Sequence, residues 1–190
     1  MSDEIYADLV YDEIRHQSPA SVGNLRERTL VIGGFAKAFA MDGWRLGWLA
    51  GPPKELITPA LRVRQYTTVC APPTFLQPAR PQPSATRAPE AETMRIQFQE
   101  RRKAGLKILT GIPGVTVSQP DGAFYFYLTY TPDTAEPAEQ LALRLLDEQR
   151  VAVVPGTAFD PPDGGTRSIR ISYACHIDDL TEGLRRIVQT

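Results

Sequence analysis

The chain has 190 residues, of which 42% are apolar and 23% are charged, and its formal net charge is −1. This composition is typical of a globular protein with one large domain or two small ones, and a charge near zero without clustered lysine and arginine argues against a nucleic-acid surface. No window approaches about 18 uninterrupted apolar residues and the first residues are acidic, so we predict neither a membrane span nor a signal peptide.

The first part of the chain predicts two strands followed by a helix. Residues 28–32 form a short β-branched run that ends at Gly33-Gly34, which is typical of a buried strand and a turn. Residues 44–50 predict a second strand. Residues 54–67 carry apolar side chains at roughly helical spacing, which predicts a helix.

Prolines interrupt the middle of the chain, since six of the 17 prolines lie between residues 72 and 89. Proline lacks a backbone donor and clashes with the preceding helical turn, so neither a helix nor a central strand is expected to run through this segment. We therefore predict a proline-rich linker at residues 78–92 between two domains.

Beyond the prolines the sequence alternates between helical and extended patterns. The predicted helices are 90–109, 136–149 and 178–188, and the predicted strands are 114–118, 123–129, 151–154 and 168–173. This order of elements indicates an α/β protein.

Lys37 is the only charged residue between positions 30 and 41. On general grounds its stem would pack on apolar neighbours while its ammonium group reaches water. Three features favour a chemical role instead. Gly33-Gly34 would let a ligand approach the backbone closely, and desolvation by the neighbouring phenylalanines would favour an uncharged amine, as a nucleophile requires. Arg45 adds a planar, positively charged guanidinium group, whose N–H donors match the geometry of a phosphate.

The segment from Gly34 to Gly47, GFAKAFAMDGWRLG, resembles the pyridoxal-phosphate (PLP) attachment segment of class I and II aminotransferases, which are fold-type-I PLP enzymes. The resemblance implies that Lys37 forms a Schiff base with PLP and moves a proton between substrate and cofactor. It also implies that Arg45 binds the cofactor phosphate. Gly34 lies in the same phosphate-binding part of the motif, where many members carry a serine, so the resemblance implies one phosphate hydrogen bond fewer here.

A second match lies at residues 2–6, SDEIY, which resemble a strand-end segment of the same family. Taken alone, these residues would be interpreted as a frayed, solvated terminus. The resemblance implies that Asp3 pairs with the pyridine nitrogen of PLP and that Tyr6 donates to its phenolic oxygen. A carboxylate at this place keeps the ring nitrogen protonated, so that the ring can accept electrons.

A third match is Ser168 to Tyr173, SIRISY. A lone arginine in a strand more often belongs to a surface ion pair. The resemblance implies instead that Arg170 binds the α-carboxylate of the substrate through two parallel hydrogen bonds. Residues 120–125 and 153–159 also resemble family segments, and we interpret these as structural parts of the small domain.

The resemblance covers nearly the whole chain, but the chain corresponds to only about the second half of the family. It implies an α/β fold made of the C-terminal part of the PLP-dependent transferase major domain and a small α+β C-terminal domain. The expected parts are a partial PLP-binding large domain at 1–77, the proline-rich linker at 78–92, and an inter-domain helix with the small domain at 93–190. The absent half normally supplies sheet strands and further cofactor contacts, so we expect an exposed sheet edge near Met1.

Residues 80–88 depart from the family, whose members carry a helix rich in small apolar residues at this place. We interpret the stretch as an out-of-frame translation of a GC-rich gene, with the frame restored before Glu90. Reading the coding DNA one base over is then expected to give an alanine-rich helix. Stop codons or polar sequence in that frame would contradict the hypothesis.

The function that the resemblance implies is transamination, in which the amino group of an L-amino acid passes to a 2-oxo acid through PLP at Lys37. A PLP-dependent C–S lyase or synthase is the alternative within the fold, because the same motifs serve all of these reactions. Two further alternatives are an inactive fragment of a disrupted gene and half of a split enzyme that a separate N-terminal half completes. Family members form homodimers, so a homodimer is also an expected assembly.

The chain has two cysteines, Cys70 and Cys175, which cannot build a disulfide framework. No CxxC or HxxxH spacing indicates zinc, so we predict no metal site. Because disulfides mark oxidising compartments, we predict a cytoplasmic location.

Overall fold

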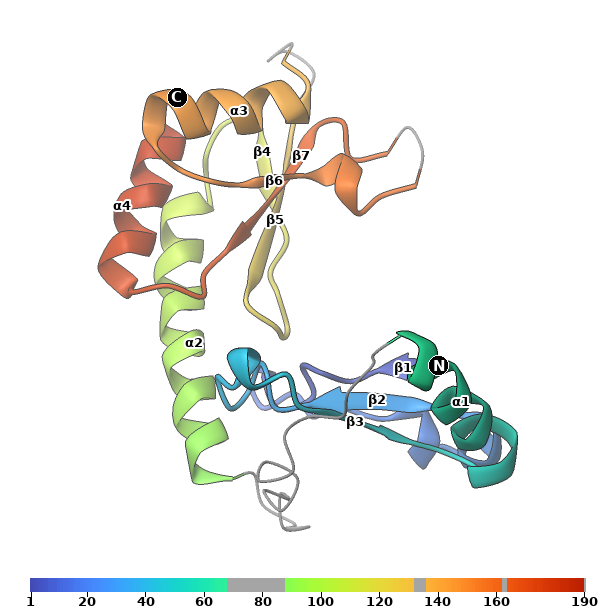
Figure 1. The fold of residues 1–190 in the computed structure, drawn as a ribbon. Helices are drawn as coiled ribbons and strands as arrows, with labels where there is room; N and C mark the ends of the chain where they lie inside the picture. The colour runs from blue at the N-terminus through green and yellow to red at the C-terminus, as the bar shows by residue number, and fades with distance from the viewer. Residues whose placement is uncertain (68–87, 132–135, 162–163, 190) are drawn as a thin grey trace. The chain divides into compact units, whose positions relative to one another are not determined.

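The structure is a computed structural model that describes residues 1–67, 88–131, 136–161 and 164–189. The chain forms two compact units, Met1–Arg95 and Ile96–Thr190, and each unit has its own β-sheet (Figure 1). Most of the predicted linker at 78–92 lies outside the described residues. Its last part belongs to a helix, which begins at Pro89.

The first unit is built on a three-stranded sheet in the order β1-β2-β3. These strands are β1 (Ser2–Asp3), β2 (Val31–Gly34) and β3 (Gly47–Ala50). β1 runs parallel to β2, with Asp3 opposite Ile32, and β3 runs antiparallel to β2. Leu9 and Tyr11, which follow β1, are fully buried, so the loop after this strand carries part of the core.

The predicted turn at Gly33-Gly34 was wrong, because both glycines lie inside β2 and pair with β3. The physical reason is close packing: a Cβ at Gly33 would lie 2.2 Å from the ring of Trp48 on β3. The predicted strand at 44–50 begins three residues late, at Gly47. Arg45 has a left-handed backbone with φ 51°, which a strand cannot contain.

Helical turns surround this sheet. Two short 3-10 turns, Pro19–Ser21 and Leu25–Arg28, lead into β2. A wide helical turn, Pro53–Ile57, continues directly into α1 (Thr58–Thr67), so the predicted helix at 54–67 is confirmed. No residue of α1 is buried, and all of them except the half-buried Ala60 are exposed.

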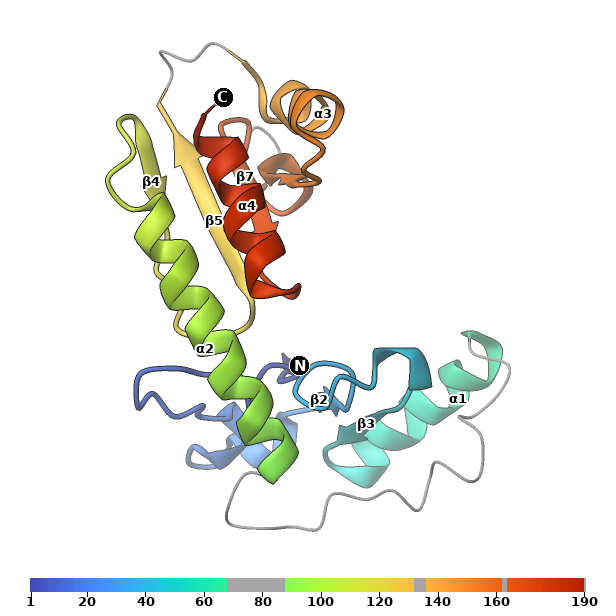
Figure 2. The same cartoon turned by 90° about the vertical axis from the view of Figure 1, so that its left-hand side faces the viewer.

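The second unit has a four-stranded antiparallel sheet in the order β4-β5-β7-β6. Its strands are β4 (Val115–Val117), β5 (Tyr125–Tyr130), β6 (Val154–Pro155) and β7 (Ser168–Ser172). Its helices are α2 (Pro89–Leu109, whose first residues belong to the first unit), α3 (Ala138–Gln149) and α4 (Ile177–Val188). α4 and the part of α2 in this unit lie along one face of the sheet (Figures 1 and 2).

The core of the second unit lies between this sheet face and the two helices. It contains aromatic and aliphatic side chains from both layers, namely Phe98, Leu109, Phe126, Leu128, Ile169, Ile171, Leu180 and Leu184. Gly105 allows α2 to approach the sheet, because a Cβ there would lie 2.5 Å from the ring of Phe126. The predicted helices and the α/β fold class are confirmed.

The predicted strand at 151–154 was wrong over most of its length, since β6 contains only Val154 and Pro155. The end of α3 accounts for the difference. Arg150 adopts a left-handed backbone with φ 57°, and Val151 N donates to Leu145 O at 3.1 Å. These residues therefore close the helix, as is common at helix C-termini, before the chain can extend.

Candidate functional site

Lys37 lies in a loop that leads from β2 to β3. Backbone hydrogen bonds close this loop, from Met41 N to Phe35 O at 3.2 Å and from Phe35 N to Leu46 O at 3.3 Å. Phe35 is buried, and its ring centroid lies 5.6 Å from that of Phe39. Lys37 itself is half-buried. The backbone that carries the amine is therefore held at the carboxyl end of β2.

The segment after β1 brings Tyr6 close to the lysine. Nζ of Lys37 lies 6.0 Å from the centroid of the Tyr6 ring. Asp3 ends β1 and is exposed, and one of its carboxylate oxygens accepts from Ile5 N at 3.2 Å. The predicted residues of this unit thus lie at the carboxyl ends of two neighbouring parallel strands, which is where α/β sheets commonly bind ligands.

Gly34 and Arg45 complete the predicted group in this unit. Gly34 is the last residue of β2, and a Cβ there would lie 3.0 Å from Ile5 Cδ1 and 3.2 Å from Leu46 O. A serine at this place would therefore need its neighbours to shift. Arg45 is exposed, and its Nη1 donates to Asp42 O at 2.9 Å, which holds the guanidinium beside the same loop.

Glu4 is a residue of this region that the sequence did not single out. Its side chain is only 9% exposed, and it accepts from Ser18 Oγ at 2.6 Å and lies 3.1 Å from Nε2 of His16. Burial alone raises the pKa of Glu4, but hydrogen bonds from Ser18, His16 and Ser2 and the charge of His16 outweigh burial. The pKa of this carboxyl is therefore below its ordinary value.

Arg170 belongs to the second unit and lies in the middle of β7, opposite Tyr127 of β5 and Val154 of β6. Its Cζ lies 4.3 Å from the ring centroid of Tyr125 and 4.0 Å from that of Phe159. In the part of the chain that the structure describes, no carboxylate forms an ion pair with Arg170. The two rings hold the guanidinium by cation–π contact and leave its N–H groups for another acceptor.

Tyr125 and Phe159 lie in the two segments that the sequence analysis interpreted as structural. A sequence signal for Tyr125 exists in the alternation of side chains along β5. Tyr125 lies on the same face of the strand as Tyr127, which pairs with Arg170, so Tyr125 is the diagonal neighbour of Arg170. No sequence signal places Phe159, since it follows the short turn Gly156–Ala158.

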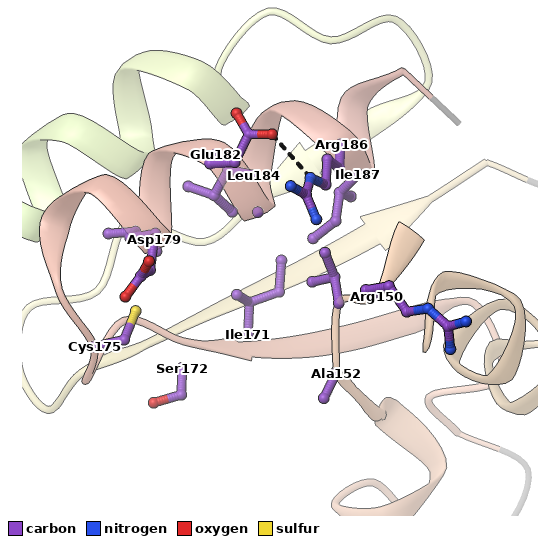
Figure 3. A pocket seen from close by; sticks show the side chains of 13 residues that line it. Arg150, Ala152, Ile171, Ser172, Cys175, Asp179, Glu182, Leu184, Arg186 and Ile187 are labelled. Atoms are coloured by element: carbon purple, nitrogen blue, oxygen red, sulfur yellow. Dashed lines mark hydrogen bonds and ion pairs between the residues drawn. The ribbon is translucent and has the colours of Figure 1, made fainter. Parts of the chain in front are cut away.

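A hollow of about 320 Å³ opens between α4 and β7 of the second unit (Figure 3). Its lining includes Arg150, Cys175, Glu182 and Arg186, and Arg186 Nε donates to Glu182 Oε1 at 2.9 Å. Partial desolvation raises the pKa of the Cys175 thiol above its ordinary value, although the residue as a whole is exposed. None of the predicted site residues lines this hollow.

The first unit has a larger hollow of about 1040 Å³ at the side of β2 and β3. Its apolar lining includes Val31, Leu49 and Ile57, and charged residues such as Glu27 lie at the same hollow. Leu49 is 45% exposed, which is high for a leucine on a sheet.

Comparison with known proteins assigns the family. The sequence-family model for aminotransferases of class I and II matches residues 1–187 of this chain. The chain belongs to this family. It is 40% identical over 188 residues to a putative aminotransferase of Bacillus subtilis, and 37% identical over 191 residues to an aspartate aminotransferase of Pyrococcus abyssi. Each alignment covers 98% of this chain and 47% of the relative, so the chain spans about half the length of these relatives.

Solved structures agree with this assignment. The aromatic aminotransferase of Pyrococcus horikoshii is 37% identical and superposes with a TM-score of 0.85, over 99% of this chain and 49% of that protein. The N-succinyldiaminopimelate aminotransferase of Mycobacterium tuberculosis is 30% identical with the same TM-score of 0.85, over 98% of this chain and 48% of that protein. The resemblance inferred from the motifs is therefore confirmed.

Class I and II aminotransferases depend on PLP, and the donor groups of the first unit fit this cofactor. The amine of Lys37 and the phenol of Tyr6 lie near each other, the carboxylate of Asp3 stands at the end of β1, and the guanidinium of Arg45 belongs to the loop that also carries Lys37. They are complementary in type to an aldehyde, a phenolic oxygen, a pyridine nitrogen and a phosphate.

The described ranges contain neither a metal-ligating cluster nor a helix suited to a membrane. No group of three or more histidine, cysteine, aspartate or glutamate side chains there could hold a metal ion. No helix there combines the length and the apolar character that crossing a membrane requires.

Proposed function

We propose that this chain is the C-terminal half of a PLP-dependent aminotransferase, which moves an amino group from an L-amino acid to a 2-oxo acid. The observation that carries the proposal is the approach of the Lys37 amine to within 6.0 Å of the Tyr6 ring, beside the strand that ends in Asp3. The names of the relatives support an amino acid as the substrate class, because they include aspartate and aromatic-amino-acid aminotransferases.

In this proposal each residue has a defined task toward PLP, which supplies an electron sink when it is bound. Lys37 binds the cofactor covalently through Nζ and holds the proton that moves at the substrate carbon. Asp3 holds a proton on the ring nitrogen and Tyr6 donates to the phenolic oxygen. Arg45 binds the phosphate beside Gly34, whose lack of a side chain leaves the backbone accessible.

Arg170 is proposed to bind the α-carboxylate of the amino acid and of the 2-oxo acid. The supporting observation is its orientation by Tyr125 and Phe159, at 4.3 and 4.0 Å, without a carboxylate partner among the described residues. A planar guanidinium held in this way suits a carboxylate through two parallel hydrogen bonds.

Assembly and location belong to the same proposal. We propose that the large domain is represented by residues 1–77 and the small domain with its inter-domain helix by 93–190, and that a polypeptide equivalent to the relatives' other half completes the fold. Aminotransferases are typically dimers, so the completed protein is proposed to form a homodimer, in the cytoplasm. A C–S lyase or synthase would use the same residues, and product analysis separates these reactions.

The test is PLP binding by the purified chain, with Lys37→Ala as the decisive variant. We expect the wild-type chain to develop a PLP-dependent absorbance band in the near-visible range and to carry PLP on the Lys37 peptide after borohydride reduction. Lys37→Ala is expected to lose both signals completely. Lys54→Ala removes an exposed lysine of the same unit and is expected to keep them.

The alternative outcome is equally definite. If no PLP-dependent band appears in the wild-type chain, the isolated chain does not bind PLP and the hypothesis of an inactive fragment is favoured. If a band remains in Lys37→Ala, another lysine reacts, and the assignment of Lys37 is wrong.

A further inference from the structure

Glu4 lies between Asp3 and Tyr6 in the sequence but has a different environment. Its backbone N donates to Ile32 O at 2.8 Å, so it continues the pairing of β1 with β2. Because successive side chains along a strand point to opposite faces, the exposed carboxylate of Asp3 and the buried one of Glu4 lie on different sides of this segment. Glu4 therefore holds the segment from the side opposite Asp3.

We propose that Glu4 is a positioning residue, whose buried carboxylate binds Ser18 and His16 and thereby fixes the places of Asp3 and Tyr6. The inference rests on the proposed function, because it takes Asp3 and Tyr6 as cofactor-binding groups. It concerns the shape of the segment 3–6, which can be measured whether or not PLP binds.

The contacts of Glu4 join two parts of the chain that are far apart in sequence. Ser18 donates to the Glu4 carboxylate at 2.6 Å and also caps the turn Pro19–Ser21, where its Oγ accepts from Ala20 N at 3.2 Å. The carbonyl of Glu4 accepts from Ala7 N at 3.0 Å and closes the turn that contains Tyr6. One residue thus connects the end of β1, the turn of Tyr6 and the turn Pro19–Ser21.

The negative charge of Glu4 matters as well as its shape. Hydrogen bonds to a charged group contribute more than those between neutral groups, and a buried partner left without its bond is costly. Gln would keep an acceptor for Ser18 but lose the attraction to His16. Ala would lose both contacts and leave a small cavity.

The test uses the full chain with Glu4→Ala and Glu4→Gln, and Glu90→Gln as a matched control that removes an exposed carboxylate from the same unit. PLP affinity is measured by absorbance at neutral pH, and hydrogen exchange of the amides of Glu4, Ala7 and Ala20 is measured without PLP. We expect Glu4→Ala to weaken PLP binding about tenfold, or about 1.4 kcal/mol, and to lose protection at these amides. The PLP affinity and the amide protection of Glu4→Gln are expected to lie between those of Glu4→Ala and the wild type. Glu90→Gln is expected to match the wild type in both.

Several results would overturn the proposal. One is unchanged affinity and unchanged exchange in Glu4→Ala. Another is a lower melting temperature with unchanged PLP affinity of the folded protein, which would make Glu4 structural only. If Glu4→Ala does not fold, Ser18→Ala and His16→Gln each remove one partner, and both are expected to give smaller losses at the same amides.

The two proposals can fail separately. If the wild-type chain binds no PLP, the proposed function fails for the isolated chain, and the exchange measurement alone decides on Glu4. Loss of protection confined to residues 2–9 and 18–21 then supports its positioning role, and loss spread over the whole unit contradicts it.

The pH dependence gives an independent readout. The pKa of Glu4 lies below its ordinary value of 4.5, so its contribution to stability is complete above that value and is lost as the pH falls through the lower, folded pKa. Among the described residues, His16 is the titratable group whose side chain contacts the Glu4 carboxylate. The difference in melting temperature between wild type and Glu4→Gln should be present at pH values above the pKa of Glu4 and vanish as the pH falls through it, and a difference that persists in acid argues against a role of the Glu4 charge.

Discussion

Mixing this chain with a separate polypeptide that corresponds to the other half of its relatives is expected to produce aminotransferase activity that neither chain has alone. The change expected is from no measurable activity to a clear rate. Its physical basis is the unfinished first unit. Among the described residues, both outer strands of its sheet, β1 and β3, pair only with β2, and every residue of β3 is exposed. Open strand edges bind further strands readily.

The surface beside β3 has the chemistry of a packing interface. Trp48 and Leu49 are 44% and 45% exposed, and Leu49 lines the hollow of about 1040 Å³ beside Val31. Apolar surface gathered in this way marks a site that another polypeptide covers. The relatives are about twice as long as this chain, so we expect a polypeptide equivalent to their remaining half to cover this surface.

The chain carries its own reporter for this association. Its two tryptophans, Trp44 and Trp48, both lie in the first unit, and both are about half exposed. In Trp44→Phe the remaining fluorescence comes from Trp48 on β3 and is expected to shift to the blue when the other half binds. A half taken from the Pyrococcus abyssi aspartate aminotransferase provides the first partner, and amino-group transfer from L-aspartate to a 2-oxo acid provides the activity readout.

A pair of matched substitutions tests the location of the interface. Leu49→Asp is expected to abolish both the shift and the activity, because an exposed apolar contact becomes a buried charge. Leu143→Asp places the same charge on α3 of the second unit, where the leucine is also exposed, and is expected to have no effect. Equal effects of the two substitutions would place the partner elsewhere, and no association at all would favour the inactive-fragment reading.

The sequence predicted most of the fold because its helices carry clear signals. The predicted helices at 90–109, 136–149 and 178–188 appear within two residues of α2, α3 and α4. They have apolar positions at helical spacing, and α4 also has acids in its first turn and arginines in its last. The family motifs then supplied the tertiary arrangement that local patterns do not contain.

The errors have local physical causes. A glycine in a sequence can indicate either a turn or a place where another residue packs closely on the backbone. At Gly33 the second explanation applies, because the Trp48 ring of the paired strand lies against it. Arg45 and Arg150 adopt left-handed backbones that end a helical turn and α3, respectively. Glycine is the residue expected in this conformation, so the sequence contains no sign of it at these positions. These are exceptions to residue preferences, which tertiary packing stabilises.

The candidate site was predictable only in part. Lys37 and Tyr6 lie together as their motifs imply, but their roles toward PLP stay predictions until binding is measured. The contact of Glu4 with His16 was missed, because a pair separated by twelve positions leaves no periodic signal, and the sequence analysis gave His16 no role. Phe159 was likewise placed beside Arg170 only by the fold.

Gly165→Ala is expected to destabilise the second unit by about 3 kcal/mol and to loosen Arg170. Gly165 has φ +67°, a conformation that costs an alanine about 1–2 kcal/mol. A Cβ there would also lie 2.3 Å from the carbonyl carbon of Gly156, and overpacking of this kind typically costs about 1–3 kcal/mol. Backbone atoms cannot move aside as a flexible side chain can, so the two costs add.

The effect reaches Arg170 through a short chain of contacts. Gly156 begins the turn that leads to Phe159, whose ring lies 4.0 Å from the guanidinium. Gly165 O accepts from Ser168 N at 3.1 Å, at the start of the strand that carries Arg170. Displacing Gly165 from Gly156 therefore shifts the two segments that orient Arg170.

The matched control is Gly111→Ala. Gly111 lies in the same unit with φ +89°, but nothing lies within 4 Å of a Cβ built on it, so this variant isolates the backbone cost. Because both tryptophans lie in the first unit, stability is followed by native-state hydrogen exchange of amides in and next to β5 and β7, such as Tyr173 N directly after β7, which donates to Phe124 O at 2.9 Å. If Gly165→Ala lowers their protection no more than Gly111→Ala, the collision with Gly156 is relieved at little cost, and Gly165 does not hold the segment that orients Arg170.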